Sequence, residues 1–286
     1  MKIPPLAPLF SKGGLGGFES YFLRYKSDQM SEVLKAEGLS KHFGGLIAVN
    51  QVNFHINQYE TVGIIGPNGS GKTTFFNLLS GLFPPTAGRI TFFGSDITHL
   101  PSNQRVMKGM VRTFQLVSVF NSMSVWENLV LSSIRFQKEP ISEWKFLLSP
   151  ANNESIRRRC YEAMKLVGLE SKALILTSEL SYGFKRMLEI GIALSLNPKL
   201  LLLDEPLSGL SDMEIAEVLD VLQRVKKNLT LVIIEHKLSK IVNLVDRLCV
   251  MNEGNFICEG KPDQVLSEPA VRECYWGKGE IDQWSS

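Results

Sequence analysis

The residues with the clearest chemistry lie between Gly66 and Thr73. Their order, Gly-Pro-Asn-Gly-Ser-Gly-Lys-Thr, fits the P-loop pattern, in which glycines let backbone N–H groups converge on a triphosphate. Lys72 adds a positive charge for the outer phosphates, and the hydroxyl of Thr73 can bind Mg²⁺. A strand over 61–65 and an apolar helix over 74–79 are predicted on either side, so a helix N-terminus favours the bound negative charge. The chain is therefore predicted to bind a nucleoside triphosphate.

An acidic pair further along the chain indicates what happens to that triphosphate. Residues 200–203 are four leucines, as expected of a central parallel strand, and Asp204 ends the strand. There a carboxylate can reach Mg²⁺, directly or through water. Glu205 can orient and deprotonate an attacking water, and a general base of this kind accelerates a reaction by about 10²–10⁴-fold. Hydrolysis is the predicted reaction.

Other polar positions are weaker signals. His236 ends another apolar strand and can contact the outer phosphate, although a lone histidine there also fits a structural role. Gln115 follows a predicted strand, at the carboxyl end where the sites of α/β proteins gather. Ser181 and Gly183 precede a helical run, where a second anion site is possible but the residues alone favour an ordinary N-cap.

Alternating strands and helices are predicted to position these residues. Between 124 and 168 the strand signal disappears and apolar residues recur at helical spacing, with turns near 139–140 and 149–153. Ser211 and Glu214 form a capping box that opens a helix. From Arg247 onward two short strands and one small terminal helix are expected. The other predicted strands are 33–36, 47–49, 52–56, 89–94, 111–114 and 231–234.

This order predicts an α/β domain with a parallel sheet and an inserted helical subdomain. Residues 1–30 are interpreted as an N-terminal extension, flexible because of the glycines at 13–17. The main domain is expected to span 31–277, with the helical subdomain at about 116–195 and a short tail over 278–286.

Composition narrows the class of protein. The 286 residues are 44% hydrophobic and 21% charged, as in globular proteins, and the net charge of +2 does not favour nucleic acid as a partner. No apolar run reaches the ~18–20 residues that span a bilayer, and three prolines interrupt the N-terminal apolar stretch, unlike a signal peptide. The four cysteines form no C-x-x-C pair, so zinc is not expected. A cytosolic, nucleotide-using protein is the expectation.

Together and in this order, the motifs resemble the ATP-binding-cassette ATPases of ABC transporters. They are the P-loop, Gln115, the Leu-Ser-Tyr-Gly of 180–183, the Leu-Asp-Glu-Pro of 203–206, and His236, and the match covers roughly 31–277. The resemblance implies a P-loop NTPase fold with a parallel-sheet core, an antiparallel β-subdomain and an α-helical subdomain. The stretches at 43–49, 111–115, 188–190 and 234–236 are similar to the ATPases of branched-chain and neutral amino-acid importers; importers of urea and short amides share much of them.

The resemblance implies roles for single positions. Phe43 would stack on the adenine ring, and Mg²⁺ would lie among Thr73, Gln115 and Asp204. Glu205 would be the catalytic base and His236 the switch, with Lys72 and Gln115 completing the catalytic set. Gln115 would also couple the site to the helical subdomain. The implied ATP-binding residues of the loop and first helical turn are Gly66, Pro67, Asn68, Gly69, Ser70, Gly71, Lys72, Thr73 and Thr74.

The resemblance also implies partners. Ser181 and Gly183 would contact the γ-phosphate of ATP bound to a second ATPase subunit, the same chain or a paralogous one, in a head-to-tail pair. Closing and opening of that pair would drive permease subunits, with a substrate-binding protein in the complex. The ATPase would sit peripherally on the cytoplasmic face of the inner or plasma membrane. No nucleic acid is expected as a partner.

Two positions depart from the family pattern. Phe184 stands where glutamine is usual, and Ser211 stands where aspartate or asparagine is usual. The first changes any polar contact at that position, and the second bears on cross-talk between two sites. Glu205 and His236 are intact, so hydrolysis is expected.

Three other functions remain to be weighed. Import of urea or short amides would use the same machinery, because permease and binding protein select the cargo. A non-transport cassette acting on ribosomes or DNA usually has two cassettes or a long coiled coil, whereas this chain has one P-loop and no sustained heptads. A kinase or GTPase is opposed by the acidic pair of Asp204 and Glu205 and by the absence of a guanine-reading motif.

Overall fold

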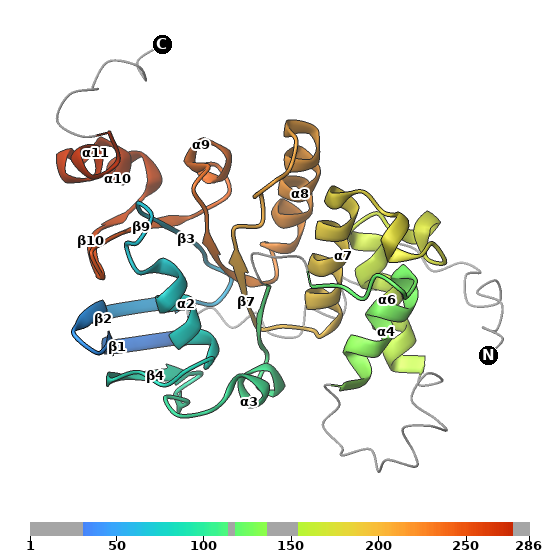
Figure 1. Ribbon diagram of the computed structural model, residues 1–286, viewed down its shortest axis with the longest axis horizontal. Coiled ribbons are helices and arrows are strands. Elements are labelled where there is room, and N and C mark those ends of the chain that lie inside the picture. Colours follow the sequence, from blue (N-terminus) through green and yellow to red (C-terminus); the bar gives the residue numbers. More distant parts are fainter. Residues whose placement is uncertain (1–30, 114–117, 136–153, 277–286) are drawn as a thin grey trace. The chain divides into compact units, whose positions relative to one another are not determined.

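The computed structural model describes residues 31–113, 118–135 and 154–276 (Figure 1). The predicted N-terminal extension, Gln115 and the C-terminal tail lie outside the described residues. The boundaries predicted for the main domain and its helical subdomain stay predictions.

A six-stranded sheet carries the P-loop and the acidic pair. Its order is β10-β9-β3-β8-β7-β6, and all neighbours are parallel except the antiparallel pair β9 and β10 at one edge. Every residue of β3, β7 and β8 is buried, which confirms the apolar runs as central strands. The strands are β3 (Thr61–Ile65), β6 (Met110–Arg112), β7 (Leu200–Asp204), β8 (Thr230–Ile234), β9 (Arg247–Asn252) and β10 (Asn255–Gly260).

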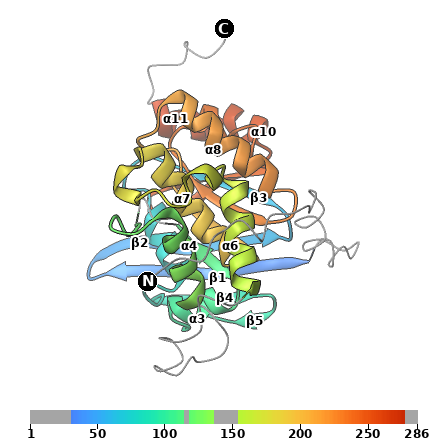
Figure 2. The ribbon, with the colours of Figure 1, turned by 90° about the vertical axis from the view of Figure 1, so that its right-hand side faces the viewer.

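The second sheet is antiparallel, in the order β2-β1-β4-β5. In Figure 2 the long strands β1 and β2 run side by side, as their register requires. The prediction of two strands at 47–49 and 52–56 is wrong, because both belong to β2. A bulge interrupts the alternation: Gln51 has a φ of +46° and donates its N–H to the Ser40 hydroxyl at 2.9 Å. The strands are β1 (Glu32–Phe43), β2 (Leu46–Asn57), β4 (Ala87–Phe92) and β5 (Ser95–Asp96).

Three of the described helices contact one another: α4 (Val125–Arg135), α6 (Glu154–Leu166) and α7 (Tyr182–Ser195). Both ribbon views show them as neighbours (Figures 1 and 2). Helix α8 (Asp212–Val225) opens with the predicted capping box, in which the Glu214 carboxylate accepts the Ser211 N–H at 3.0 Å. None of the described helices is long and apolar enough to cross a membrane.

The C-terminal segment differs from the prediction of one terminal helix. It contains α10 (Pro262–Ser267) and α11 (Pro269–Trp276), after the short α9 (Leu238–Ile241) nearer β8. The break falls at Glu268, whose backbone is extended. The residue before a proline disfavours the helical conformation, and Pro269 itself is well suited to begin the next helix.

The P-loop helix α2 (Lys72–Ser80) is held by the core. Phe75 packs against Phe54 and Phe256, with ring centroids 5.5 and 5.3 Å apart. Arg105, which is 1% exposed and lies in α3 (Ser102–Met107), donates to the carbonyls of Leu78 and Leu79 at 2.8 and 2.7 Å. Carbonyls of the last helical turn lack partners within the helix, so this buried guanidinium satisfies them. Burial lowers the pKa of Arg105 to about 10.

Candidate active site

The P-loop joins β3 to α2, and its glycines are required by close approach. Gly71 has a φ of +104°, and a Cβ there would lie 2.4 Å from the carbonyl oxygen of Ala48. A Cβ on Gly66 would lie 2.1 Å from the carbonyl oxygen of Met251. No larger residue fits either position without moving the backbone. The sequence pattern therefore corresponds to a loop that packs tightly against β2 and β9.

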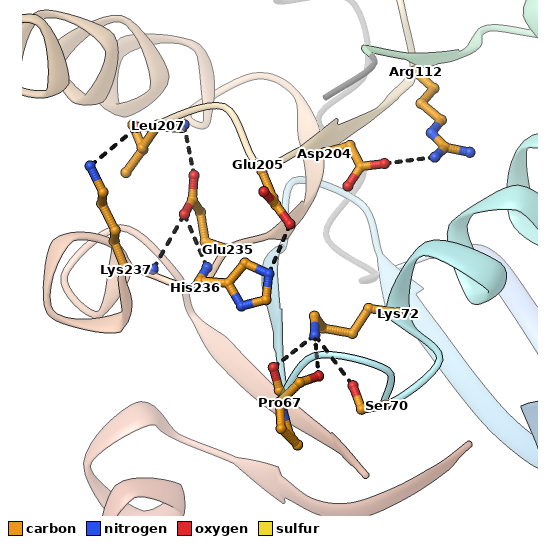
Figure 3. A network of polar contacts seen from close by, with 11 residues as sticks. Pro67, Ser70, Lys72, Arg112, Asp204, Glu205, Leu207, Glu235, His236 and Lys237 are labelled. Atoms are coloured by element: carbon orange, nitrogen blue, oxygen red, sulfur yellow. Dashed lines mark hydrogen bonds and ion pairs between the residues drawn. The ribbon is translucent and has the colours of Figure 1, made fainter. Parts of the chain in front are cut away.

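Lys72 is buried and directed back at its own loop (Figure 3). Its ammonium donates to the carbonyls of Gly66 and Pro67 at 2.7 and 2.8 Å and to the Ser70 hydroxyl at 3.3 Å. Burial lowers the pKa of Lys72, and the charges of nearby Glu205 and Asp204 act in the opposite direction. A phosphate oxygen would compete with the carbonyls for the same ammonium protons.

Glu205 and His236 meet at the carboxyl edge of the sheet. Glu205 Oε1 lies 2.8 Å from His236 Nε2, because the two residues follow the neighbouring parallel strands β7 and β8 (Figure 3). Glu205 has a φ of +47°, a left-handed conformation that is costly for any residue but glycine. Its N–H is bound by the carbonyl of Ile234 at 2.9 Å. The structure thus brings together two residues that the sequence placed only at separate strand ends.

Asp204 has a partner that sequence reasoning missed. Its Oδ2 accepts a 2.6 Å bond from Arg112, and both side chains are almost fully buried. Arg112 ends β6 and also donates to Asn77 Oδ1 and Ser80 Oγ of α2, at 2.6 and 3.0 Å. A charge-assisted bond of this kind fixes the carboxylate's orientation. One sequence feature could have identified Arg112 as a site residue: it lies near the carboxyl end of a predicted strand, close to Gln115.

The residues present fit the Mg²⁺ predicted from the sequence. Asp204 is a buried carboxylate at the strand end, and Thr73 carries a hydroxyl in the first turn of α2. Mg²⁺ takes one or two protein oxygens and otherwise keeps water and substrate phosphates. The described residues contain no cluster of three or more His, Cys, Asp or Glu that could hold a metal ion. The third predicted ligand, Gln115, lies outside the described residues.

Phe43, the predicted adenine-stacking residue, ends β1 with 47% of its surface exposed. Its ring packs against Phe83 in a T-shaped arrangement, with centroids 5.6 Å apart and planes at 85°. The ammonium of Lys41 lies 5.2 Å from the same ring. An exposed aromatic ring held by such contacts offers a surface on which a base can stack.

The amino end of α7 carries Ser181 and Gly183. The Ser181 hydroxyl accepts the N–H of Phe184 at 3.4 Å, so the N-cap favoured from the residues is present. Gly183 packs against Glu214 so closely that a Cβ would lie 2.2 Å from the carboxylate. Phe184, which stands where the family usually has glutamine, instead packs under Lys172, whose ammonium lies 4.4 Å from the ring.

Comparison with known proteins decides the family. A family model described as ABC transporter matches residues 49–208. The chain belongs to the ABC transporter family. High-affinity branched-chain amino acid transport ATP-binding proteins are similar to it: BraF of Pseudomonas aeruginosa is 35% identical and LivG of Escherichia coli 36% identical. Each alignment covers 86% of this chain and 98% of the relative.

Solved structures agree with the sequence relatives. A crystal structure of the ADP conformation of an ATP-binding cassette from an ABC transporter is 33% identical, with a TM-score of 0.78 over 87% of this chain and all of that one. A nucleotide-free cassette gives 32% identity and a TM-score of 0.77. The predicted fold class is therefore confirmed, and this ABC cassette is an ATP-binding ATPase.

Proposed function

We propose that this ABC ATPase energises the import of branched-chain or neutral amino acids through partner permeases. Relatives matched over nearly their whole length bear the name of branched-chain amino acid transport ATP-binding proteins. These names favour amino acids over urea or short amides as cargo. The geometric observation that carries the ATPase part is the contact between Glu205 and His236 at 2.8 Å, at the same sheet edge as the P-loop.

In the proposed reaction, Glu205 is the base. A water oxygen attacks the γ-phosphorus, the bond from that phosphorus to the oxygen bridging to the β-phosphate breaks, and ADP leaves. Glu205 accepts the proton of the attacking water. His236, held beside Glu205, contacts the γ-phosphate and registers its release. Mg²⁺, when bound by Thr73, Asp204 and Gln115, would neutralise charge on the phosphates.

The proposed partners follow from the amino end of α7. Ser181 is exposed at the N-terminus of α7, and a helix N-terminus favours a phosphate, here one supplied by a second ATPase subunit; Gly183 is buried beside it, against Glu214. The pair would act on permease subunits that receive cargo from a substrate-binding protein. The ATPase would then lie on the cytoplasmic face of the membrane without entering it.

The test of the ATPase assignment is Glu205→Gln. We expect ATP binding to persist, hydrolysis to fall by about 10²–10⁴-fold, and ATP to trap a dimer. Turnover with ATP and the mass of the complex by light scattering measure both effects. Glu217→Gln, on the exposed face of α8, is the matched control and keeps wild-type turnover. Wild-type turnover in Glu205→Gln would show that the base is another residue.

The cargo is tested separately. Cells lacking this chain should lose uptake of labelled leucine, regain it with the wild-type chain, and fail to regain it with Glu205→Gln. Uptake of labelled urea in the same cells is the comparison. Loss of urea uptake with unchanged leucine uptake would replace the amino-acid proposal by the urea one, while leaving the ATPase assignment in place.

A further inference from the structure

Glu235 is a buried acidic residue that the proposed chemistry does not use. It directly follows β8, precedes His236 and is 2% exposed. Burial raises the pKa of its carboxyl group, and backbone N–H donors oppose that effect. A buried carboxyl group is costly unless hydrogen bonds compensate it, so its contacts show what the residue does.

The carboxylate of Glu235 joins two segments. Its Oε1 accepts the N–H of Leu207 at 2.7 Å, in the loop after the acidic pair (Figure 3). Its Oε2 accepts the N–H groups of His236 and Lys237 at 3.1 and 3.3 Å. In the reverse direction, the Lys237 ammonium donates to the Leu207 carbonyl at 3.4 Å. One side chain thus connects the loop carrying Glu205 to the segment carrying His236.

This connection bears on a strained catalytic position. Glu205 has the left-handed φ of +47°, and such a conformation persists only where the surroundings hold it. The bond from Glu235 to Leu207 holds the chain two residues beyond Glu205. Misplacement of a reacting group by about 1 Å can cost about 10²-fold in rate.

We propose that Glu235 is a positioning residue that sets where Glu205 and His236 lie relative to the attacked phosphate. The inference rests on the proposed function, because it requires Glu205 to be the base. Two acceptor oxygens are needed, one for each segment. An amide of the same size offers one oxygen and one NH₂ group, and the NH₂ group would face a backbone N–H.

The experiment compares Glu235→Gln with the wild type. We expect kcat to fall by about 10- to 100-fold. The KM for ATP and the affinity for a fluorescent ATP analogue should stay within about 2-fold, because the P-loop contacts are made elsewhere. In the Glu205→Gln background the second change should lower the residual rate no further, since the base whose position it sets is already absent.

Two further variants complete the test. Glu60→Gln is the matched control: that carboxylate accepts an Asn57 N–H at 2.9 Å and an Arg247 bond at 2.7 Å, at the amino end of β3, and kcat should not change. Glu235→Asp keeps both oxygens but shortens the side chain by a methylene group, so it should also lower kcat with the KM for ATP unchanged, and it serves if the amide variant fails to fold.

Some outcomes overturn the inference. Wild-type kcat with only a lower melting temperature would make Glu235 purely structural, and parallel losses of kcat and ATP affinity would place its effect on binding. If Glu205→Gln is inactive while Glu235→Gln is normal, this inference alone fails. If Glu205→Gln turns over normally, the proposed function fails first.

Discussion

The site has a cationic side, the P-loop with Lys72, and an acidic side, the sheet edge with Asp204 and Glu205. Different kinds of contact hold the two sides. Lys72 binds carbonyls of its own loop, five and six residues away in sequence. Glu205 and Asp204 are held by His236 and Arg112, 31 and 92 residues away. A phosphate can replace the local contacts of the lysine without moving a strand, whereas the acidic side chains are held by partners that other strands and their following loops position. The P-loop is therefore the adaptable side, and the sheet edge is the preset side.

The largest expected effect is on kcat and comes from a substitution at the sheet edge, the preset side. His236→Ala removes the partner of Glu205, the proposed base, so kcat should fall by about 10²-fold while ATP affinity is kept. Steady-state turnover and binding of a fluorescent ATP analogue measure the two quantities. His55→Ala, an exposed histidine of β2, is the control. Equal losses in both quantities would show that the acidic edge also contributes to binding.

A substitution in the P-loop, the adaptable side, should weaken ATP binding. Lys72→Ala removes the charged donor that we predict reaches the outer phosphates, and ATP affinity should fall by about 10- to 100-fold. Titration with the same fluorescent analogue tests this. Lys227→Ala, which changes an exposed residue just after α8, should bind like the wild type. Unchanged affinity in Lys72→Ala would mean that the lysine stays on its own carbonyls when ATP binds.

A smaller effect is expected on the Mg²⁺ dependence of nucleotide binding, and it tests the role of Arg112. Arg112→Lys keeps the charge but loses the fork that reaches Asp204 and α2 together. The Mg²⁺ concentration for half-maximal nucleotide binding should rise by about 10-fold, while binding without Mg²⁺ stays unchanged. Arg89→Lys, whose exposed pair with Asp96 is 3.4 Å long, is the control. An unchanged Mg²⁺ requirement would show that Arg112 does not influence Mg²⁺ binding.

The smallest expected effect is on the melting temperature. It concerns Glu214 of α8, which belongs to neither side of the site. The N–H of Ser211, its hydroxyl and the N–H of Gly183 lower the pKa of Glu214. Its stabilising contribution is therefore present above the ordinary glutamate pKa and is lost as pH falls through the lowered value. The melting temperature of Glu214→Gln should be below that of wild type near pH 7, and the difference should vanish at low pH. A difference that grows on acidification would contradict the capping contribution.

Prediction from sequence succeeded where contacts are local. The strand before the P-loop, the helix after it, the apolar strands β7 and β8 and the capping box of α8 all appear as expected. Prediction failed where one residue interrupts a pattern. The bulge at Gln51 made the single long strand β2 look like two strands, and the break before Pro269 divides the one expected helix into two. The contacts of Arg112 and Glu235 were missed because their partners belong to other strands and loops.

By itself, the sequence determined the phosphate-binding loop, the nature of the acidic pair and the order of the motifs. These depend on residue type and on spacings of a few residues, which set backbone conformation directly. Only the tertiary structure decided that Glu205 faces His236, that Arg112 holds Asp204 and that Glu235 joins two loops. Those pairings follow from which strands lie side by side, and strand order is set by packing of the whole sheet.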